Sequence, residues 1–398
     1  MKKLIVIALV ICLLAGGLLG YTLGRDRVIK PAATPIPTPA ATPAPAAAET
    51  GTLDYDAIYA LHDPNEVVMT AYGRDVTWGE YFYYLFRQAE SVESYFSSMA
   101  TYGMPLTWSD VAEGEDVTYA ELTVESAENI ARSLAATAGF AKENGAELTD
   151  EDQASIDEKV RSDIEAVVGE GGTRKDLDTY LGQIHMPVTL YDYMNEISAL
   201  YQSGFVKLYG ENGEKLSDED ALTWMEANGY MSANHILLMT IDASTRESLD
   251  EAAKAEKLAK AQEIAAELQA IEDQEALLAR FAELKTELDE DTGKTAYPNG
   301  YVFQPGEMVT EFEETVKSQE AYQVSDPVES AYGYHVIMTL PLDPDEVLEY
   351  SSAGTEMTAR AVAANELYSN AADAYAQTED AVFAEGFEAP NLLDYIKE

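Results

Sequence analysis

The sequence predicts an α+β protein in which a unit of antiparallel sheet and helices is inserted into a mostly helical chain. Residues 53–230 and 344–398 show helical spacing of apolar residues and repeated helix-start signals, whereas residues 231–343 alternate short β-rich runs with amphipathic stretches. The order within that middle segment, namely strand, two or more helices, strand, helix, strand and strand, is typical of a compact α+β unit.

Residues 1–30 predict a transmembrane helix that acts as a signal anchor. Two lysines precede an apolar span from Leu4 to Leu23, about 20 residues, which is long enough to cross a bilayer. Ala15-Gly16-Gly17 is a weak cleavage site, so a cleaved signal peptide stays open as the alternative. Residues 31–52 are a Pro/Ala/Thr-rich linker that cannot bury a core. We therefore expect a single-pass protein of the cell membrane with its bulk on the extracytoplasmic side.

Charge and cysteine content exclude several classes of function. The chain has 25 Lys and Arg against 72 Asp and Glu, a net charge of −47, which would be repelled by nucleic acid. This acidity serves either solubility or the attraction of basic clients. The single cysteine, Cys12, lies in the first apolar span and provides neither a disulfide nor a zinc cluster. We expect no metal and no cofactor.

Helix-start signals divide the region 53–230. Val67–Tyr72 predicts a short strand that turns at Gly73, and Thr77-Trp78-Gly79-Glu80 predicts a capping box before an aromatic helix over 81–93. Thr118, Thr149 and Ser217 open further helices, and Val188–Tyr209 reads as one long helix. Some aromatic residues of the 81–96 stretch belong to a core, and others could line a groove for unfolded polypeptide. The set is Tyr81, Phe82, Tyr83, Tyr84, Phe86, Tyr95 and Phe96.

The middle segment predicts helices over 248–270 and around 277–288, a strand at 301–303, and an apolar face after Pro305-Gly306. From Asp345 the chain is expected to be helical again, with a tail that packs back on the N-terminal helices. The apolar positions of these elements are Leu258, Ala261, Ala265 and Leu268, then Leu277, Phe281, Leu284 and Leu288, then Met308, Phe312 and Val316.

Two histidines lie in short apolar runs that read as buried strands, Asn234–Leu238 and Gly333–Met338. Alternation places His235 on one face with Leu237 and His335 on one face with Ile337. If these strands are neighbours, both imidazoles face one pocket. The chain has only four histidines, so a shared pocket for two of them indicates a site.

Residues 232–340 resemble the parvulin family of peptidyl-prolyl isomerases in three ordered motifs, namely 233–237, 299–313 and 324–337. With the anchor, the helical region and the tail, the whole chain resembles extracytoplasmic foldases of the PrsA type, relatives of SurA. The resemblance implies a parvulin domain at 231–343, a SurA-N-like chaperone domain at 53–230 and a helical tail at 344–398. It also implies clients that are unfolded or newly exported polypeptides with X-Pro bonds, and it allows a homodimer.

The resemblance also implies the roles of individual residues. His235 and His335 match the paired central histidines of the family, and Asp291 matches a position that carries aspartate or cysteine. Met308 and Phe312 match the walls that hold the proline ring, with Tyr301 and Tyr332 as further substrate contacts. One departure is the turn Pro298-Asn299-Gly300-Tyr301, where the family has Gly-Asp-Leu-Gly.

Rotation about an X-Pro bond faces a barrier of ~18–20 kcal/mol because amide resonance must be broken. An apolar socket that clamps the proline ring, beside histidines that both donate and accept, suits that reaction. Arg246 is the only cation between Met239 and Asp250, so we expect unphosphorylated clients. The alternative is a non-catalytic holdase whose parvulin module only binds peptide, with a histidine pair that merely satisfies its own hydrogen bonds.

Overall fold

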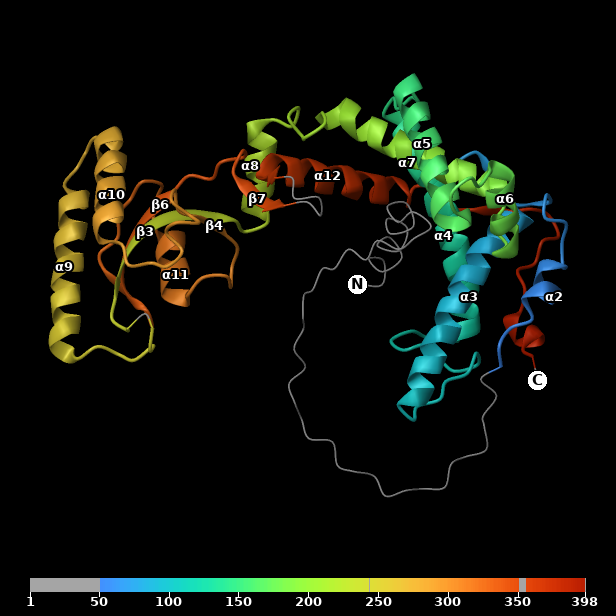
Figure 1. Cartoon of the computed structure of the whole chain (residues 1–398), viewed down its shortest axis with the longest axis horizontal. Helices are drawn as coiled ribbons and strands as arrows, with labels where there is room; N and C mark the ends of the chain where they lie inside the picture. Colours follow the sequence, from blue (N-terminus) through green and yellow to red (C-terminus); the bar gives the residue numbers. More distant parts are fainter. Residues whose placement is uncertain (1–50, 243, 351–355, 398) are drawn as a thin grey trace, which may run out of the picture. The chain divides into compact units, whose positions relative to one another are not determined.

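The computed structural model describes residues 51–242, 244–350 and 356–397, which belong to two compact units (Figure 1). Of the described residues, the first unit comprises 51–208 and 367–397, and the second comprises those between Tyr209 and Glu366. The predicted membrane helix and the linker up to residue 50 lie outside the described residues. Within the described ranges, no helix is both long enough and apolar enough to cross a bilayer.

The first unit is mainly helical and contains a small sheet. Its elements are α2 (Tyr55–Tyr59), β1 (Val67–Ala71), β2 (Arg74–Thr77), α3 (Trp78–Thr101), α4 (Tyr119–Glu143), α5 (Asp150–Val168), α6 (Arg174–Gln183), α7 (Val188–Tyr209), the second half of α12 (Ala359–Tyr375), β9 (Val382–Phe383) and the 3-10 turn η1 (Leu392–Tyr395). Helix α7 has the bounds that the sequence predicts. The predicted helix starts at Thr118 and Thr149 are confirmed, and each of these threonines forms a capping box.

The aromatic residues of α3 form the core of the first unit. Five of the seven are buried, and only Tyr95, at 36%, is classed as exposed. Because α3 packs against α2 and α4 as well as the β1–β2 strands, most of its circumference is covered. This explains why its aromatic residues ring the helix rather than forming one stripe.

The predicted capping box at Thr77 is wrong. Thr77 is the N-cap of α3, but its side chain makes no capping hydrogen bond. Glu80, the residue expected to complete the box, is buried, pairs at 2.7 Å with the guanidinium of Arg74 and accepts the backbone N–H of Thr77, so only its half of the box forms. A buried carboxylate needs a charged partner more than a helix end needs a second cap.

The C-terminal end of the chain joins the N-terminal part of the first unit. Strand β9 pairs antiparallel with β1, which gives the sheet order β2-β1-β9. Leu53 forms an isolated bridge with Ile396, and the hydroxyl of Tyr72 donates to the carbonyl of Tyr375 at 2.8 Å.

The second unit contains a four-stranded antiparallel sheet in the order β4-β3-β6-β5. Its elements are α8 (Asp218–Ala227), β3 (Met231–Met239), α9 (Glu251–Gln269), α10 (Gln274–Leu288), β4 (Tyr301–Phe303), α11 (Thr310–Ser318), β5 (Val328–Glu329), β6 (Gly333–Leu340), β7 (Val347–Tyr350) and β8 (Glu356–Thr358). The prediction of a strand at 301–303 and of helices over most of 248–270 and 277–288 is confirmed.

Helices cover both faces of this sheet (Figure 1). Helices α9 and α10 pack on the face that carries Ile236 and Val336, and α11 packs on the face that carries Ala233 and Ile337. Strands β3 and β6 are therefore buried on both sides, which explains their continuous apolar sequences. Gly333 opens β6 with φ +153°, and a Cβ there would lie 2.2 Å from the carbonyl oxygen of Leu238. This close approach requires glycine.

The expectation of continuous helix from Asp345 onward is wrong. Strands β7 and β8 pair antiparallel, and α12 begins only at Ala359. Arg360, at the start of α12, is 9% exposed. Its guanidinium donates to Asp345 at 2.9 Å, to the carbonyl of Leu216 at 2.6 Å and to Asp218 at 2.7 Å. These bonds hold residue 345 beside the start of α8, so it is not available to begin a helix.

Candidate active site

Strands β3 and β6 bring the two histidines together. The strands pair antiparallel, with His235 opposite Ile337 and Leu237 opposite His335. The histidines are therefore diagonal neighbours on the same face of the sheet. Their Nδ1 atoms lie 3.0 Å apart, and their rings stack at 23° with centroids 5.2 Å apart. Both are buried, His235 at 6% exposure and His335 at 4%.

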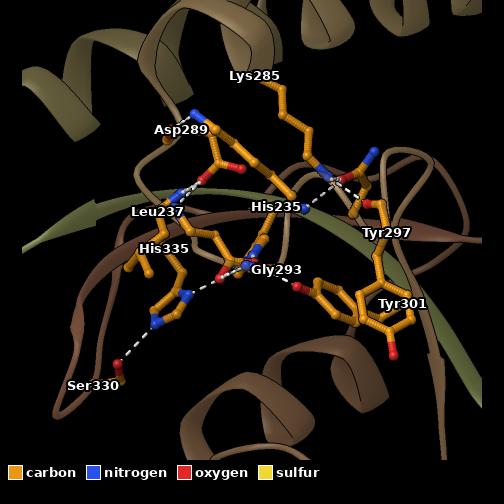
Figure 2. A network of polar contacts seen from close by, with 12 residues as sticks. His235, Leu237, Lys285, Asp289, Gly293, Tyr297, Tyr301, Ser330 and His335 are labelled. Carbon is orange, nitrogen blue, oxygen red and sulfur yellow. Dashed lines mark hydrogen bonds and ion pairs between the residues drawn. The ribbon is translucent and has the colours of Figure 1, made fainter. Parts of the chain in front are cut away.

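A chain of polar contacts continues from each histidine (Figure 2). His235 Nε2 lies 3.0 Å from Asp291 Oδ2, and the hydroxyl of Tyr301 donates to the same oxygen at 2.5 Å. At the other end, His335 Nε2 lies 2.7 Å from Ser330 Oγ, which accepts the N–H of Tyr332 at 3.1 Å. Four side chains are thus connected in series to Asp291.

The negative charge of Asp291 determines which group donates and which accepts in every hydrogen bond of this series of side chains. Hydrogen bonding from His235, and then from Tyr301, holds the pKa of Asp291 well below its usual range despite partial burial. An ionised carboxylate only accepts, so His235 Nε2 carries a hydrogen. A neutral His235 then accepts at Nδ1, which requires a hydrogen on His335 Nδ1 and leaves His335 Nε2 to accept from Ser330 Oγ.

Burial keeps His335 neutral. Burial, reinforced by the neighbouring His235, lowers the pKa of His335 to about 3, although Asp291 opposes the shift. The ring therefore keeps one donor and one acceptor nitrogen at neutral pH. Burial and the charge of Asp291 raise the pKa of Tyr301, so its hydroxyl stays protonated and remains a donor.

A pocket of about 430 Å³ with both apolar and polar lining residues opens beside this series of side chains. The rings of Phe312, on α11, and His235 are nearly perpendicular with centroids 5.4 Å apart, and the rings of Tyr301 and His235 are nearly perpendicular with centroids 5.6 Å apart. Glu313 fixes the loop before α11 by accepting the backbone N–H groups of Gly306 (2.7 Å) and Met308 (3.1 Å). The lining residues are His235, Leu237, Met239, Arg246, Asp291, Thr292, Tyr301, Glu307, Met308, Val309, Phe312, Tyr332 and His335.

The structure places all seven predicted site residues around this one pocket. Two of them have further contacts that the sequence did not indicate. Tyr301 provides a hydroxyl to Asp291 as well as a wall, and Tyr332 lies at the rim, 41% exposed, with the Arg246 guanidinium 5.9 Å from its ring centroid. Within the described ranges, no group of three or more His, Cys, Asp or Glu side chains is arranged to hold a metal ion.

The sequence did not reveal Ser330 or Glu313 as parts of the site. Ser330 lies five residues before His335 in a Ser-Ala-Tyr-Gly turn, and a serine at such a turn is a signal for side-chain hydrogen bonding. Glu313 has no comparable signal, because it is one acidic residue among 72.

The comparisons with known proteins agree with this geometry. A family model described as Rotamase, the PPIC-type PPIase domain, matches residues 235–340. These residues form a peptidyl-prolyl isomerase domain of the parvulin class.

The curated relatives are foldases. The chain is 36% identical over 151 residues to Foldase protein PrsA of Halalkalibacterium halodurans, covering 37% of this chain and 41% of that protein. It is 48% identical over 59 residues to Foldase protein PrsA 3 of Bacillus cereus, covering 14% of this chain and 20% of that protein. The matched stretches thus span less than half of these relatives. The solved structure of PrsA from Bacillus subtilis is 19% identical, covers 79% of this chain and 91% of that chain, and has a TM-score of 0.23, too low to support an argument.

Proposed function

We propose that this protein is a peptidyl-prolyl cis-trans isomerase and foldase that acts on unfolded or newly exported polypeptides. The observation that carries the proposal is the series Asp291–His235–His335, in which both histidines are buried and which borders a pocket with apolar walls inside the matched parvulin domain. A polar series of this kind at the wall of a pocket large enough for a prolyl peptide suits a reaction in which no covalent bond breaks.

The catalytic task is to favour the twisted amide over both planar forms. In the twisted state the proline nitrogen becomes pyramidal, and the carbonyl loses its conjugation with that nitrogen. The proline ring would be held, and water excluded, by Met308, Phe312 and the ring of Tyr301. The carbonyl group that precedes the proline would then rotate while it lies beside the Asp291–His235–His335 series. Each ~1.4 kcal/mol of preferential binding to the twisted state gives about a tenfold increase in rate.

His235 and His335 act as hydrogen-bonding groups rather than as an acid and a base. Neutral rings with one donor and one acceptor each adjust to the moving carbonyl without a net proton transfer. Asp291 fixes the tautomer of His235, and Tyr332 at the rim contacts the residues that flank the proline. Glu307 and Asp291 make the pocket acidic apart from Arg246, which favours unphosphorylated substrates.

We also propose that the helical part of the chain, residues 53–230 with the tail 344–398, forms a chaperone domain that binds clients. The pairing of β9 with β1 and the bridge from Leu53 to Ile396 support a tail that belongs to the N-terminal helices. The apolar span of residues 4–23 and the linker after it support a membrane anchor that leaves the folded part outside the cytoplasm.

A protease-coupled assay on an Ala-Pro peptide tests the catalytic proposal. The wild-type chain is expected to accelerate isomerisation, and His235→Ala is expected to lose at least about tenfold in kcat/KM, since it removes the link between Asp291 and His335. Thermal unfolding of both proteins controls for misfolding. Equal rates for the two proteins would leave the non-catalytic holdase as the better account.

A further inference from the structure

A row of buried polar side chains lies along β3 and takes no part in the mechanism above (Figure 2). Asp289 is 2% exposed, Lys285 5% and Asn234 8%. Burying two charged groups in one small domain is costly unless they do something that apolar side chains cannot do.

These side chains complete the hydrogen bonding of a strand edge. Strand β4 pairs with β3 only at Met231–Ala233. Farther along β3, side-chain oxygens accept the backbone N–H groups that point to the β4 side of the strand. Asn234 Oδ1 accepts the N–H of His235 (2.9 Å), and Asp289 Oδ1 accepts the N–H of Leu237 (2.9 Å). Glu290 Oε2 accepts the N–H of Met239 (2.7 Å). The N–H of Glu290 donates in return to the carbonyl of Leu237 at 2.9 Å. Residues 289 and 290 thus replace a neighbouring strand.

A lysine contacts each of the three residues that supply these acceptors, although only Lys285 binds the accepting oxygen itself. Lys285 Nζ donates to Asn234 Oδ1 at 2.6 Å, Lys294 Nζ donates to the carbonyl of Asp289, and Lys257 Nζ pairs with Glu290. The chain has only 25 Lys and Arg against 72 acidic residues, so three lysines on one strand edge are not explained as an ordinary solvated surface.

Asp289 connects this edge to the polar series of the site. The same Oδ1 atom that accepts from Leu237 also accepts the backbone N–H of Asp291 at 3.0 Å. Asp289 Oδ1 therefore connects the backbone of Leu237, on the same strand as His235, to the backbone of Asp291. The carboxylate of Asp291 in turn lies beside His235 Nε2. We propose that Asp289 is a positioning residue, which holds Asp291 in register with His235 and so sets the tautomers of both histidines. The proposal rests on the isomerase function proposed above.

A carboxylate suits this position better than a neutral side chain. A single charged oxygen accepts two N–H groups more strongly than an amide or hydroxyl oxygen does. Lys285 compensates for the buried charge: burial lowers the pKa of Lys285, whereas the charge of Asp289 acts in the opposite direction. Replacement by alanine leaves the buried N–H of Leu237 and the partly buried N–H of Asp291 without this partner and loosens the 289–291 turn from β3.

A double-mutant cycle of isomerase activity distinguishes positioning from general support of the fold. Asp289→Ala is expected to lower kcat/KM by about tenfold in the wild-type background, the equivalent of losing one hydrogen bond to a charged group. In an Asp291→Ala background the same change is expected to cost less than about twofold, because the group that it positions is absent. Equal losses in both backgrounds would overturn the proposal.

Two further variants keep the test decisive if Asp289→Ala folds poorly. Asp289→Asn keeps an Oδ1 acceptor and is expected to lose less activity than the alanine variant, again only when Asp291 is present. Ser325→Ala is the matched control, because Ser325 is 6% exposed and its hydroxyl accepts the β6 N–H of Ile337 at 2.9 Å, away from Asp291. It is expected to reduce stability without changing kcat/KM.

The ring-nitrogen NMR signals of the histidines give a readout that does not depend on activity. In the wild type we expect His235 protonated at Nε2 and His335 at Nδ1, and in Asp289→Ala a mixture of tautomers. Ser325→Ala should keep the wild-type pattern. A wild type without isomerase activity would remove the proposed function, whereas an unchanged tautomer pattern in Asp289→Ala would remove the positioning role.

Discussion

Replacing His335 by glutamine should make the parvulin domain less sensitive to acid. His335 is buried at 4% exposure, and burial lowers its pKa to about 3 from the 6.5 of a free histidine. The unfolded chain therefore binds a proton at this residue at a higher pH than the folded chain does. Stability from this residue is fully present above pH 6.5 and is lost as the pH falls toward about 3.

The size of this effect follows from linkage. One pKa unit corresponds to about 1.4 kcal/mol, so the full loss on acidification is roughly 4 to 5 kcal/mol. Between pH 7 and pH 5, where only the unfolded chain becomes protonated at this residue, the loss is roughly 2 kcal/mol. In His335→Gln this contribution is absent. The wild type should therefore lose about 2 kcal/mol more than the variant over the same interval.

Urea unfolding at pH 7, 6 and 5 measures this difference in unfolding free energy. After equilibration in urea, a short hydrogen-exchange pulse at one fixed pH labels the unfolded molecules, and the label is read in peptides from β3 and β6. Val316→Ala is the control, since it removes buried apolar volume from the face of α11 that packs on the sheet and changes no titrating group. Its unfolding free energy should differ from that of the wild type by a constant amount at every pH. Parallel curves for the wild type and His335→Gln would refute the burial argument.

Two further predictions concern the walls of the pocket. Tyr301→Phe removes the hydroxyl that donates to Asp291 at 2.5 Å but keeps the ring against His235. In steady-state kinetics, kcat should fall by about threefold to tenfold with little change in KM. A change in KM alone would contradict the role of the hydroxyl. Met308→Ala removes apolar surface from the pocket. The KM for an Ala-Pro peptide should therefore rise by about threefold to tenfold. An unchanged KM would mean that the proline ring binds elsewhere.

The strands that carry the histidines could be predicted from sequence because local and long-range signals agreed there. The runs around His235 and His335 are apolar and β-rich, and burial on both faces of a central strand requires that composition. Once two such strands are antiparallel neighbours, the period of two places both rings on one face. The pocket walls at Met308 and Phe312 could be predicted because family resemblance added what periodicity alone does not give.

Features that depend on which acidic residue meets which partner could not be predicted. Glu80 looks like a capping residue until Arg74 is brought beside it by the β1–β2 turn. Asp345 looks like a helix-start residue until Arg360 binds it. Asp289 and Glu290 look like turn residues, because nothing in a stretch of acidic residues identifies the two that complete a strand edge. Each of these contacts joins positions that only the tertiary fold brings together.

Exchange NMR of an Ala-Pro peptide tests the central claim most directly, because it reports cis-trans interconversion without a coupling protease. With catalytic amounts of the full chain, the exchange rate between the two proline isomers should rise well above that of the peptide alone. His235→Ala should reduce this catalysed increase in rate at least about tenfold. Exchange that is the same with the wild type, with the variant and without protein would contradict the assignment of catalysis to the histidine pair.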